Sequence, residues 1–445
     1  MRRSWLGLLA ALLAAPCALA ASDAERVAVY HEFRQHFDAH EFDAALPLAE
    51  QLVALTEEQY GAKARELAVP LTNLGTTYHR LGKHAEAEKA YVRSIQLLEA
   101  ASSSTDKQLL PPLHGLGVTY VALGQFDNAS LVLKRAVDLS RNLNGLFSAE
   151  QLAMLDPLIR SYVELGDYQS AEKEHQYAFE VAETTFGKED PRLLEPIDSY
   201  ARWYEFVGRY STARALHARA LSIAEHDGHV TVSAVDALRG IARTYRLEAL
   251  NGPEDDPQRE APGFSDFGSF EFSPFAVTPR GFNSDGERAL LDALQALAKE
   301  QPINHARLGE TGVDLGDWYL SSGDSAKAMS AYRAAWKELQ LGGSTELLAE
   351  PRQLAYRPPQ ASITRARLDP KDAEEHLVEV HFTVLSDGHT SDVAATSSDA
   401  PEQLQKAVTL AVKRARYGPR LEEGEPVATA DVVLRERVVA KRKRH

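Results

Sequence analysis

The residues best suited to metal chemistry lie in one early stretch of the chain. Glu32, His36 and His40 recur every four residues, so a helix would align them on one stripe that could hold a divalent cation. A stable metal site also needs neighbours that hold three ligands in place, and nothing nearby fixes these three. We therefore interpret the stripe as packing and capping, with a metal as the alternative, and we predict no metal site and no cofactor.

The motifs of common enzyme chemistry are missing from the sequence. It contains no HExxH pair, no Walker phosphate loop and no GxSxG elbow, and Cys17 is its single cysteine. His376 and His381 are five residues apart in an alternating stretch, so a strand would point them to opposite faces. We therefore predict no catalytic residues and a protein that is not an enzyme.

A second set of residues could recognise a partner. One position recurs every 42 residues and often holds arginine, and with a nearby asparagine it gives the candidate groove residues Arg34, Asn73, Thr76, Arg160 and Arg202. Arginine can pair with the carboxylates of a bound peptide through charge-assisted hydrogen bonds. Alternatively, these arginines neutralise acids of the chain itself, such as Asp198 and Glu164.

These positions belong to a long internal repeat. LGTTYHRLGKHAEAEKAYVRSI starts at Leu74, and LGVTYVALGQFDNASLVLKRAV starts 42 residues later at Leu116. Each repeat has the pattern of two amphipathic helices joined at a glycine, where a residue without a Cβ can take a left-handed conformation. The turn positions are His40, Gly82, Gly124, Gly166 and Gly208, and alanines follow five residues later at Ala45, Ala87, Ala129, Ala171 and Ala213. We expect the small alanine to let the two helices approach closely, and the tyrosine four residues before each glycine to fill the space beside it.

The repeat resembles the tetratricopeptide repeat family, whose usual period is about 34 residues. The longer period and phrases such as FGKEDPRLLEP resemble the version found in kinesin light chains. The resemblance covers about residues 24–340 and implies an α-helical solenoid of helical hairpins, with a groove for a protein or peptide.

A segment rich in phenylalanine, proline and glycine interrupts the sixth repeat at about residues 251–284. We expect an ordered loop whose aromatic rings cover one flank of the solenoid, because exposing so much apolar surface is unfavourable. The alternatives are a lid or an internal ligand in the groove. As the lid of an enzyme, the segment would need an acid–base pair beside it, and we locate none.

The helical pattern stops before a proline-containing linker at 341–360, and a second domain is expected at 361–445. HLVEVHFTVLSDGHTSDVAATSS alternates about the turn Asp387-Gly388 and predicts a β-hairpin. An amphipathic helix is expected from Pro401 to Tyr417, and VATADVVLRERV forms a last strand. The chain as a whole is therefore predicted to be mainly α, with a small α+β domain at its end.

This second domain resembles the TonB carboxy-terminal domain. The residues that carry the resemblance are Phe382, Asp387, Gly388, Arg416, Tyr417 and Pro419, while Ala415 stands where the family usually has tryptophan. In that family the domain contacts outer-membrane receptors, often by adding a strand to its sheet edge. The resemblance thus implies an outer-membrane receptor or another envelope protein as partner. TonB energy transducers also have a membrane anchor and a proline-rich spacer, and here repeats occupy the place of the spacer.

The amino terminus and the charge indicate where the protein works. Residues 1–20 pair two arginines with a short apolar run and end in small residues, as expected of a cleaved signal peptide. The formal net charge of −15 argues against a nucleic-acid partner, although KRKRH at the carboxyl end forms a basic tail. We expect a scaffold in the periplasm of a Gram-negative bacterium, with no membrane span after cleavage. The alternative is a TonB-like energy transducer that keeps its amino terminus as a membrane anchor.

Overall fold

The computed structural model describes residues 11–101, 105–225, 231–251, 284–359 and 373–441. These residues form two compact parts, one ending at Leu165 and one starting at Gly166, and each part is described by itself. The first ten residues of the expected signal peptide, the phenylalanine-rich insert at 252–283 and the end of the basic tail lie outside the described residues. The predictions for those segments therefore stay predictions.

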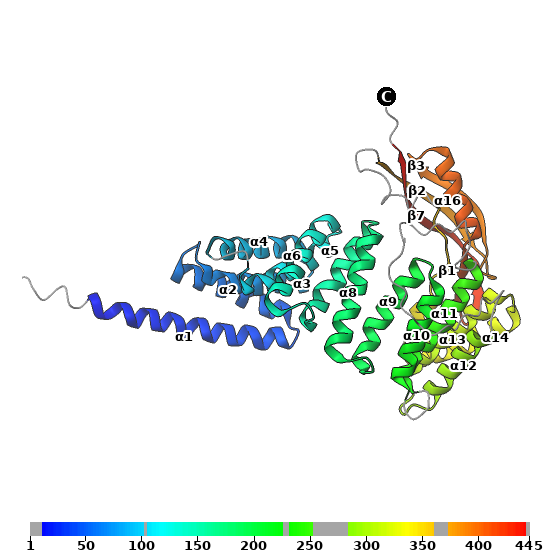
Figure 1. Cartoon of the computed structure of the whole chain (residues 1–445), viewed down its shortest axis with the longest axis horizontal. Coiled ribbons are helices and arrows are strands. Elements are labelled where there is room, and N and C mark those ends of the chain that lie inside the picture. The colour runs from blue at the N-terminus through cyan, green and yellow to red at the C-terminus, as the bar shows by residue number, and fades with distance from the viewer. Residues whose placement is uncertain (1–10, 102–104, 226–230, 252–283, 360–372, 442–445) are drawn as a thin grey trace, which may run out of the picture. The chain divides into compact units, whose positions relative to one another are not determined.

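Both parts contain helices in consecutive pairs (Figure 1). The first part contains α1 (Ala11–Asp38), α2 (Phe42–Tyr60), α3 (Ala68–Arg80), α4 (His84–Ala101), α5 (Leu110–Ala122), α6 (Phe126–Asn144) and α7 (Leu152–Glu164). The second contains α8 (Tyr168–Phe186), α9 (Leu194–Phe206), α10 (Tyr210–Ala224), α11 (Val235–Asn251), α12 (Ser284–Ala298), α13 (His305–Ser322) and α14 (Ser325–Gly342).

The expected turns and close contacts are present in both parts. Gly82 has φ 71° and Gly166 has φ 70°, and His40 takes the same left-handed conformation with φ 63°. The five alanines that follow these turns are all 0% exposed, so each is packed closely against its surroundings. The repeat pattern thus predicted both the turn and the packing around it.

Tyrosines that follow the same repeat also link neighbouring hairpins through hydrogen bonds. The hydroxyl of Tyr204 donates to Glu172 at 3.0 Å, and that of Tyr319 donates to Glu287 at 2.6 Å. Burial and the nearby carboxylate raise the pKa of Tyr319 to about 12. The sequence pattern predicted that these rings fill space but did not reveal their acidic partners.

The first helices of successive hairpins contact one another. In the first part α3 contacts α5 and α5 contacts α7, and in the second part α9 contacts α11 and α11 contacts α13. Within each part, one face is therefore built from first helices, as in a solenoid of helical hairpins.

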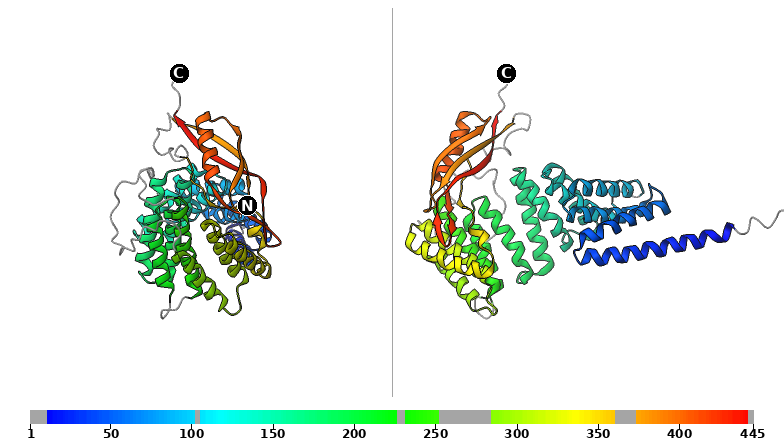
Figure 2. Two further views of the ribbon diagram at one scale, coloured as in Figure 1. Left: turned by 90° about the vertical axis from the view of Figure 1, so that its right-hand side faces the viewer. Right: turned by 180° about the vertical axis from the view of Figure 1, so that it is seen from behind.

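The carboxy-terminal domain is a small sheet with one covering helix. Strand order is β3 (Thr390–Ser398), β2 (Ala373–Val384), β7 (Thr429–Lys441), and both pairings are antiparallel. Helix α16 (Glu402–Arg414) packs on β2 and β3, and it stays on one side of the sheet in both views of Figure 2. Val380, Phe382, Val408 and Val412 form the core between them.

The structure corrects the sequence analysis at two places in this domain. The helix expected to reach Tyr417 ends at Arg414, and four short strands were missed: β1 (Arg352–Ala355), β4 (Arg416–Gly418), β5 (Arg420–Glu422) and β6 (Glu425–Val427). β1 lies within the stretch expected to be a linker and pairs with β4. Strands of three or four residues are too short to show a periodic pattern, which explains why sequence periodicity missed them.

The amino-terminal helix α1 starts at Ala11 and runs past the expected cleavage point after Ala20. Within the described part of the chain, no helix combines the length and the apolar character that crossing a bilayer requires. Removal of residues 1–20 stays a prediction.

Candidate partner-binding surfaces

The histidine stripe near the amino terminus makes local contacts. Nδ1 of His36 lies 2.6 Å from Oε2 of Glu41, and His40 occupies the turn, with its Nδ1 3.1 Å from the carbonyl oxygen of Asp38. In the regions that the structure describes, no three acids, histidines or cysteines form a group that could hold a metal ion.

The predicted groove residues differ in whether their side chains already have partners within the protein. Arg34 pairs with Asp38 at 2.7 Å, and the exposed Arg202 pairs with Asp198 at 2.7 Å. Thr76 donates to the carbonyl oxygen of Thr72 and accepts from the hydroxyl of Tyr91 at 3.0 Å. In this structure, Arg34 and Arg202 thus neutralise neighbouring acids, which is the alternative interpretation.

Two predicted groove residues remain. Asn73 is half-buried, and its carbonyl oxygen accepts a hydrogen bond from the hydroxyl of Thr77 at 2.9 Å. Arg160 is exposed on α7. A partner for this face stays a prediction.

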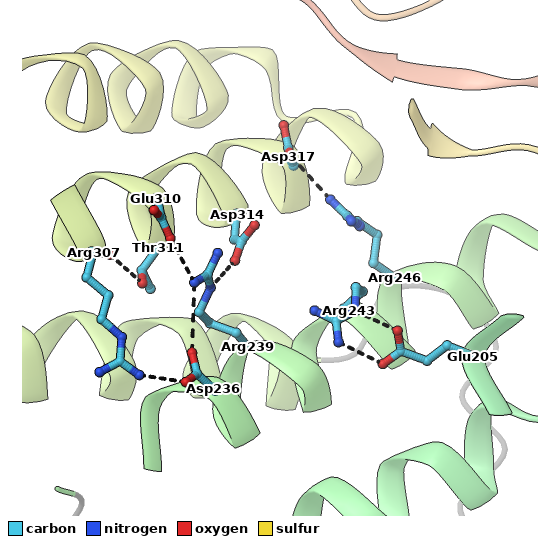
Figure 3. A network of polar contacts seen from close by, with 10 residues as sticks. All are labelled: Glu205, Asp236, Arg239, Arg243, Arg246, Arg307, Glu310, Thr311, Asp314 and Asp317. Atoms are coloured by element: carbon cyan, nitrogen blue, oxygen red, sulfur yellow. Dashed lines mark hydrogen bonds and ion pairs between the residues drawn. The ribbon is translucent and has the colours of Figure 1, made fainter. Parts of the chain in front are cut away.

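Helix α11 carries a row of arginines that faces acids on α9 and α13 (Figure 3). Nε of Arg239 lies 2.5 Å from Asp314, and Nε of Arg243 lies 2.6 Å from Glu205. The spacing of four residues puts these arginines on one side of α11. We call Arg239, Arg243 and Arg246 the α11 arginine row.

Glu205 on α9 is largely buried, with 8% of its side chain exposed, and it has two partners. Oε1 accepts from Nε2 of His217 at 2.9 Å, and Oε2 accepts from Nε of Arg243 at 2.6 Å. Burial alone would raise the pKa of Glu205, but the hydrogen bonds from His217 and Arg243 outweigh it and lower the pKa below its ordinary value. The carboxylate is therefore committed to internal pairing.

Asp317 on α13 connects the repeats to the carboxy-terminal domain. Its Oδ1 accepts from Nη2 of Arg352 at 2.8 Å and from the hydroxyl of Tyr332 at 2.7 Å, while Nη1 of Arg246 lies 3.5 Å from Oδ2. Asp317 is only 4% exposed. A buried carboxylate held by two guanidinium groups and a hydroxyl fixes β1 against the last hairpin.

Sequence reasoning missed the α11 row for two reasons. The sixth repeat has Leu250 where earlier repeats have the turn glycine, so its inner positions could not be aligned. The partners are also distant in sequence: Arg239 and Asp314 are 75 residues apart. The charges were visible in the sequence, but their pairing was not.

The hairpin and post-helix residues of the TonB-like motif come together at one end of the domain. The ring of Phe382 lies 5.3 Å from the ring of Tyr417 in the core. The backbone N–H of Tyr417 donates to the carbonyl oxygen of Gly388 at 3.0 Å, and Gly388 has φ 79°. A Cβ at Gly388 would lie 2.2 Å from the carbonyl oxygen of Tyr417, so this contact requires glycine.

The remaining motif residues border the same region. Asp387 accepts from the backbone N–H of His389 at 3.0 Å, and the carbonyl oxygen of Pro419 accepts weakly from Arg352 at 3.5 Å. Arg416 is half-buried. The motif therefore shapes the corner where the hairpin turn meets β4, next to the last repeat.

The outer strands of the sheet present backbone edges. Across the described residues, β7, which is 13 residues long, pairs only with β2, and β3 also pairs only with β2. The β2–β3 register shifts twice, whereas the β2–β7 register shifts once, near its end. β7 is thus the longer and more regular edge, and regular edges accept an added strand most readily.

Comparison with known proteins gives two families. A model for the tetratricopeptide repeat matches residues 34–100 and 150–226, and a second such model matches 111–143. The model for the carboxy-terminal domain of the Gram-negative TonB protein matches residues 371–432. No curated protein matches the chain significantly.

Solved structures give distant matches. A kinesin light chain from Podosopora anserina with nearly identical TPR-like repeats is 21% identical, with a TM-score of 0.41, over 44% of this chain and 93% of that one. BtubC from P. vanneervenii is 16% identical, with a TM-score of 0.38, over 71% and 92%. Part of a TPR repeat-containing protein from Cytophaga hutchinsonii is 14% identical, with a TM-score of 0.43, over 69% and 95%.

Both kinds of module serve contacts between proteins, through the solenoid face and the sheet edge respectively. The family matches agree with the paired helices of residues 34–226 and with the three-stranded sheet under α16. The chain therefore carries tetratricopeptide repeats followed by a TonB carboxy-terminal domain.

Proposed function

We propose that the protein is a non-enzymatic scaffold of the periplasm, in which the repeats hold one partner and the edge of β7 takes up an extended segment as an added strand. The observation that carries the proposal is the outer edge of β7, which no described strand covers, in a domain fixed to the last repeat through Asp317 and Arg352. Two linked weak contacts gain avidity without any new interaction at either one.

The fixed junction supports this joint action. Besides the buried Asp317, the hairpin of β5 and β6 places Leu421, 3% exposed, in a core with Tyr332 and Leu339 of α14. Arg333 of α14 also holds Glu425 with two bonds, at 2.7 and 2.9 Å. Sites on the last repeats and on the sheet therefore keep one spacing, which favours a partner that spans both.

The test uses the intact chain with a photo-crosslinking side chain at Val433 in β7 and, separately, at Arg160 in α7. Leu377 in β2 is the matched control, because it is also exposed but its strand lies between β3 and β7 in the sheet. We expect the same envelope protein to crosslink from Val433 and Arg160 and not from Leu377. Crosslinks from Leu377 that equal those from Val433 would contradict strand addition.

The match to the TonB domain favours a second candidate, a transducer that keeps its amino terminus in the inner membrane and couples to outer-membrane receptors. The two functions differ in the fate of residues 1–20. Amino-terminal sequencing of protein recovered from the periplasm should find Ala21 first for the scaffold. A membrane-bound protein that starts at Met1 or Arg2 would favour the transducer.

A further inference from the structure

A cavity of about 420 Å³ lies where the TonB-like motif meets the repeats. The ends of α11 and α13 form one side, β1 contributes Leu354, and the turn at Asp387 to His389 with Arg416 and Tyr417 forms the other. Ligand cavities in proteins typically measure a few hundred Å³. This cavity is separate from the predicted groove residues and from the outer edge of β7.

The walls of the cavity are held by contacts already described. The Asp317–Arg352 pair fixes β1, and the hydrogen bond from Tyr417 to Gly388 joins the hairpin turn to β4. Burial raises the pKa of Tyr417 to about 12, so this side chain stays neutral and forms part of the wall. The cavity is thus preformed, which reduces the entropy cost of binding.

One wall is apolar and lies near an arginine without an acidic partner. Leu250, Leu320 and Leu354 form the apolar wall. Within the described regions, the guanidinium of Arg416 makes one hydrogen bond, to the carbonyl oxygen of Ala415 at 3.0 Å, and no ion pair. The acid that also lines the cavity, Asp387, contacts the backbone N–H and the ring of His389 instead. Arg416 therefore has donors to offer an anion.

The end of α13 adds hydrogen-bond acceptors. The helix stops at Ser322, and its carbonyl oxygens at Tyr319 and Leu320 accept from Asp324 and Gly323. Those of Ser321 and Ser322, which also line the cavity, receive no donor from the described residues. A peptide backbone brings N–H donors for such acceptors, whereas the acyl chain of a fatty acid does not.

We propose that this cavity binds the free carboxyl terminus of a protein partner whose last side chain is apolar. The terminal carboxylate pairs with Arg416, the last side chain packs against the three leucines, and backbone N–H groups of the partner face the end of α13. The site goes beyond the proposed scaffold contacts, because it uses neither the predicted groove arginines nor the edge of β7.

The test measures binding of two hexapeptide pools to the intact chain. Both pools have leucine last and five randomised positions; one ends in a free carboxylate and the other in an amide. We expect the free acid to bind roughly tenfold more tightly or better, the gain from one charge-assisted hydrogen bond. Equal binding of the pools, or binding of neither, overturns the proposal.

Two variants and one further ligand locate the site. Arg416→Gln should remove the preference for the free acid, whereas Arg414→Gln, an equal charge change on an exposed residue outside the cavity, should keep it. If both variants lose the preference for the free acid, or if neither does, the result contradicts a site at Arg416. If dodecanoate competes as well as the free-acid pool, the ligand of the cavity is a fatty acid and the proposed peptide terminus is wrong. Crosslinking from Val433 and Arg160 tests the scaffold separately, and Arg416→Gln should leave it unchanged.

Discussion

In the second compact part, the α11 arginine row and Arg416 have opposite surroundings. In the α11 arginine row, Arg239, Arg243 and Arg246 each face a carboxylate of α9 or α13. At the cavity beside the sheet, Arg416 has only the carbonyl of Ala415 as a partner among the described residues. The comparison shows that an arginine-rich helix face need not be a binding face, because neighbouring acids decide whether the charge is available.

The largest loss of stability is expected when Asp317, the acid that pairs with Arg246 of the α11 row, is neutralised. Asp317→Asn leaves Arg246 and Arg352 as largely buried charges without a full partner, which costs about 3–5 kcal/mol of folding free energy. Denaturant unfolding checks this value. Glu425→Gln is the matched control at the same junction: its pair with Arg333 is exposed to solvent, so the loss should be much smaller than that of Asp317→Asn. Similar losses in both variants would show that Asp317 does not carry the junction.

A buried histidine that has no counterion in the described part of the chain extends the comparison. His175 lies between the rings of Tyr200 and Trp203, and burial lowers its pKa to about 4. Since its unfolded pKa is near 6.5, the folded state resists protonation, and stability falls as pH drops from 6.5 towards 4.

The expected loss from His175 between pH 7 and pH 5 is about 2 kcal/mol. His175→Phe keeps a ring in the stack and removes the titration, so its unfolding free energy should fall by that much less over the same interval. If the unfolding free energies of the wild-type protein and the variant fall in parallel with pH, His175 is protonated in the folded state as readily as in the unfolded state.

The pairing difference also predicts unequal costs for removing the arginines themselves. Arg243→Gln leaves the largely buried Glu205 without its arginine partner and should cost about 2 kcal/mol. Arg416→Gln removes no ion pair and should change stability by less than about 0.5 kcal/mol. Thermal unfolding at neutral pH compares them, and an equal loss in both would mean that Arg416 is also a structural residue.

The smallest effect is expected at an exposed groove position. Arg202→Gln breaks only the surface pair with Asp198, so stability should change by less than about 0.5 kcal/mol. If the face of first helices in the second part binds a partner, the same variant should still weaken capture of that partner. If the Arg202→Gln variant captures the partner as well as the wild-type protein does, Arg202 only neutralises Asp198.

Much of the fold could be predicted because the repeat fixes local geometry. The left-handed turn at Gly82 and the buried Ala87 follow from residue type and a period of 42 residues. The hairpin about Gly388 follows from its turn residues. The candidate sites were harder to predict, because they depend on contacts between distant segments, such as Asp317 with Arg352. The cavity at Arg416 forms only when β1, β4 and two helix ends meet.

Arginine footprinting tests the contrast between the two groups most directly. The intact chain is treated with phenylglyoxal, with and without the free-acid hexapeptide pool, and modified arginines are identified by mass spectrometry. We predict that the pool slows modification of Arg416 and leaves the rates at Arg239 and Arg243 unchanged. Protection of the α11 row with no change at Arg416 would contradict the account.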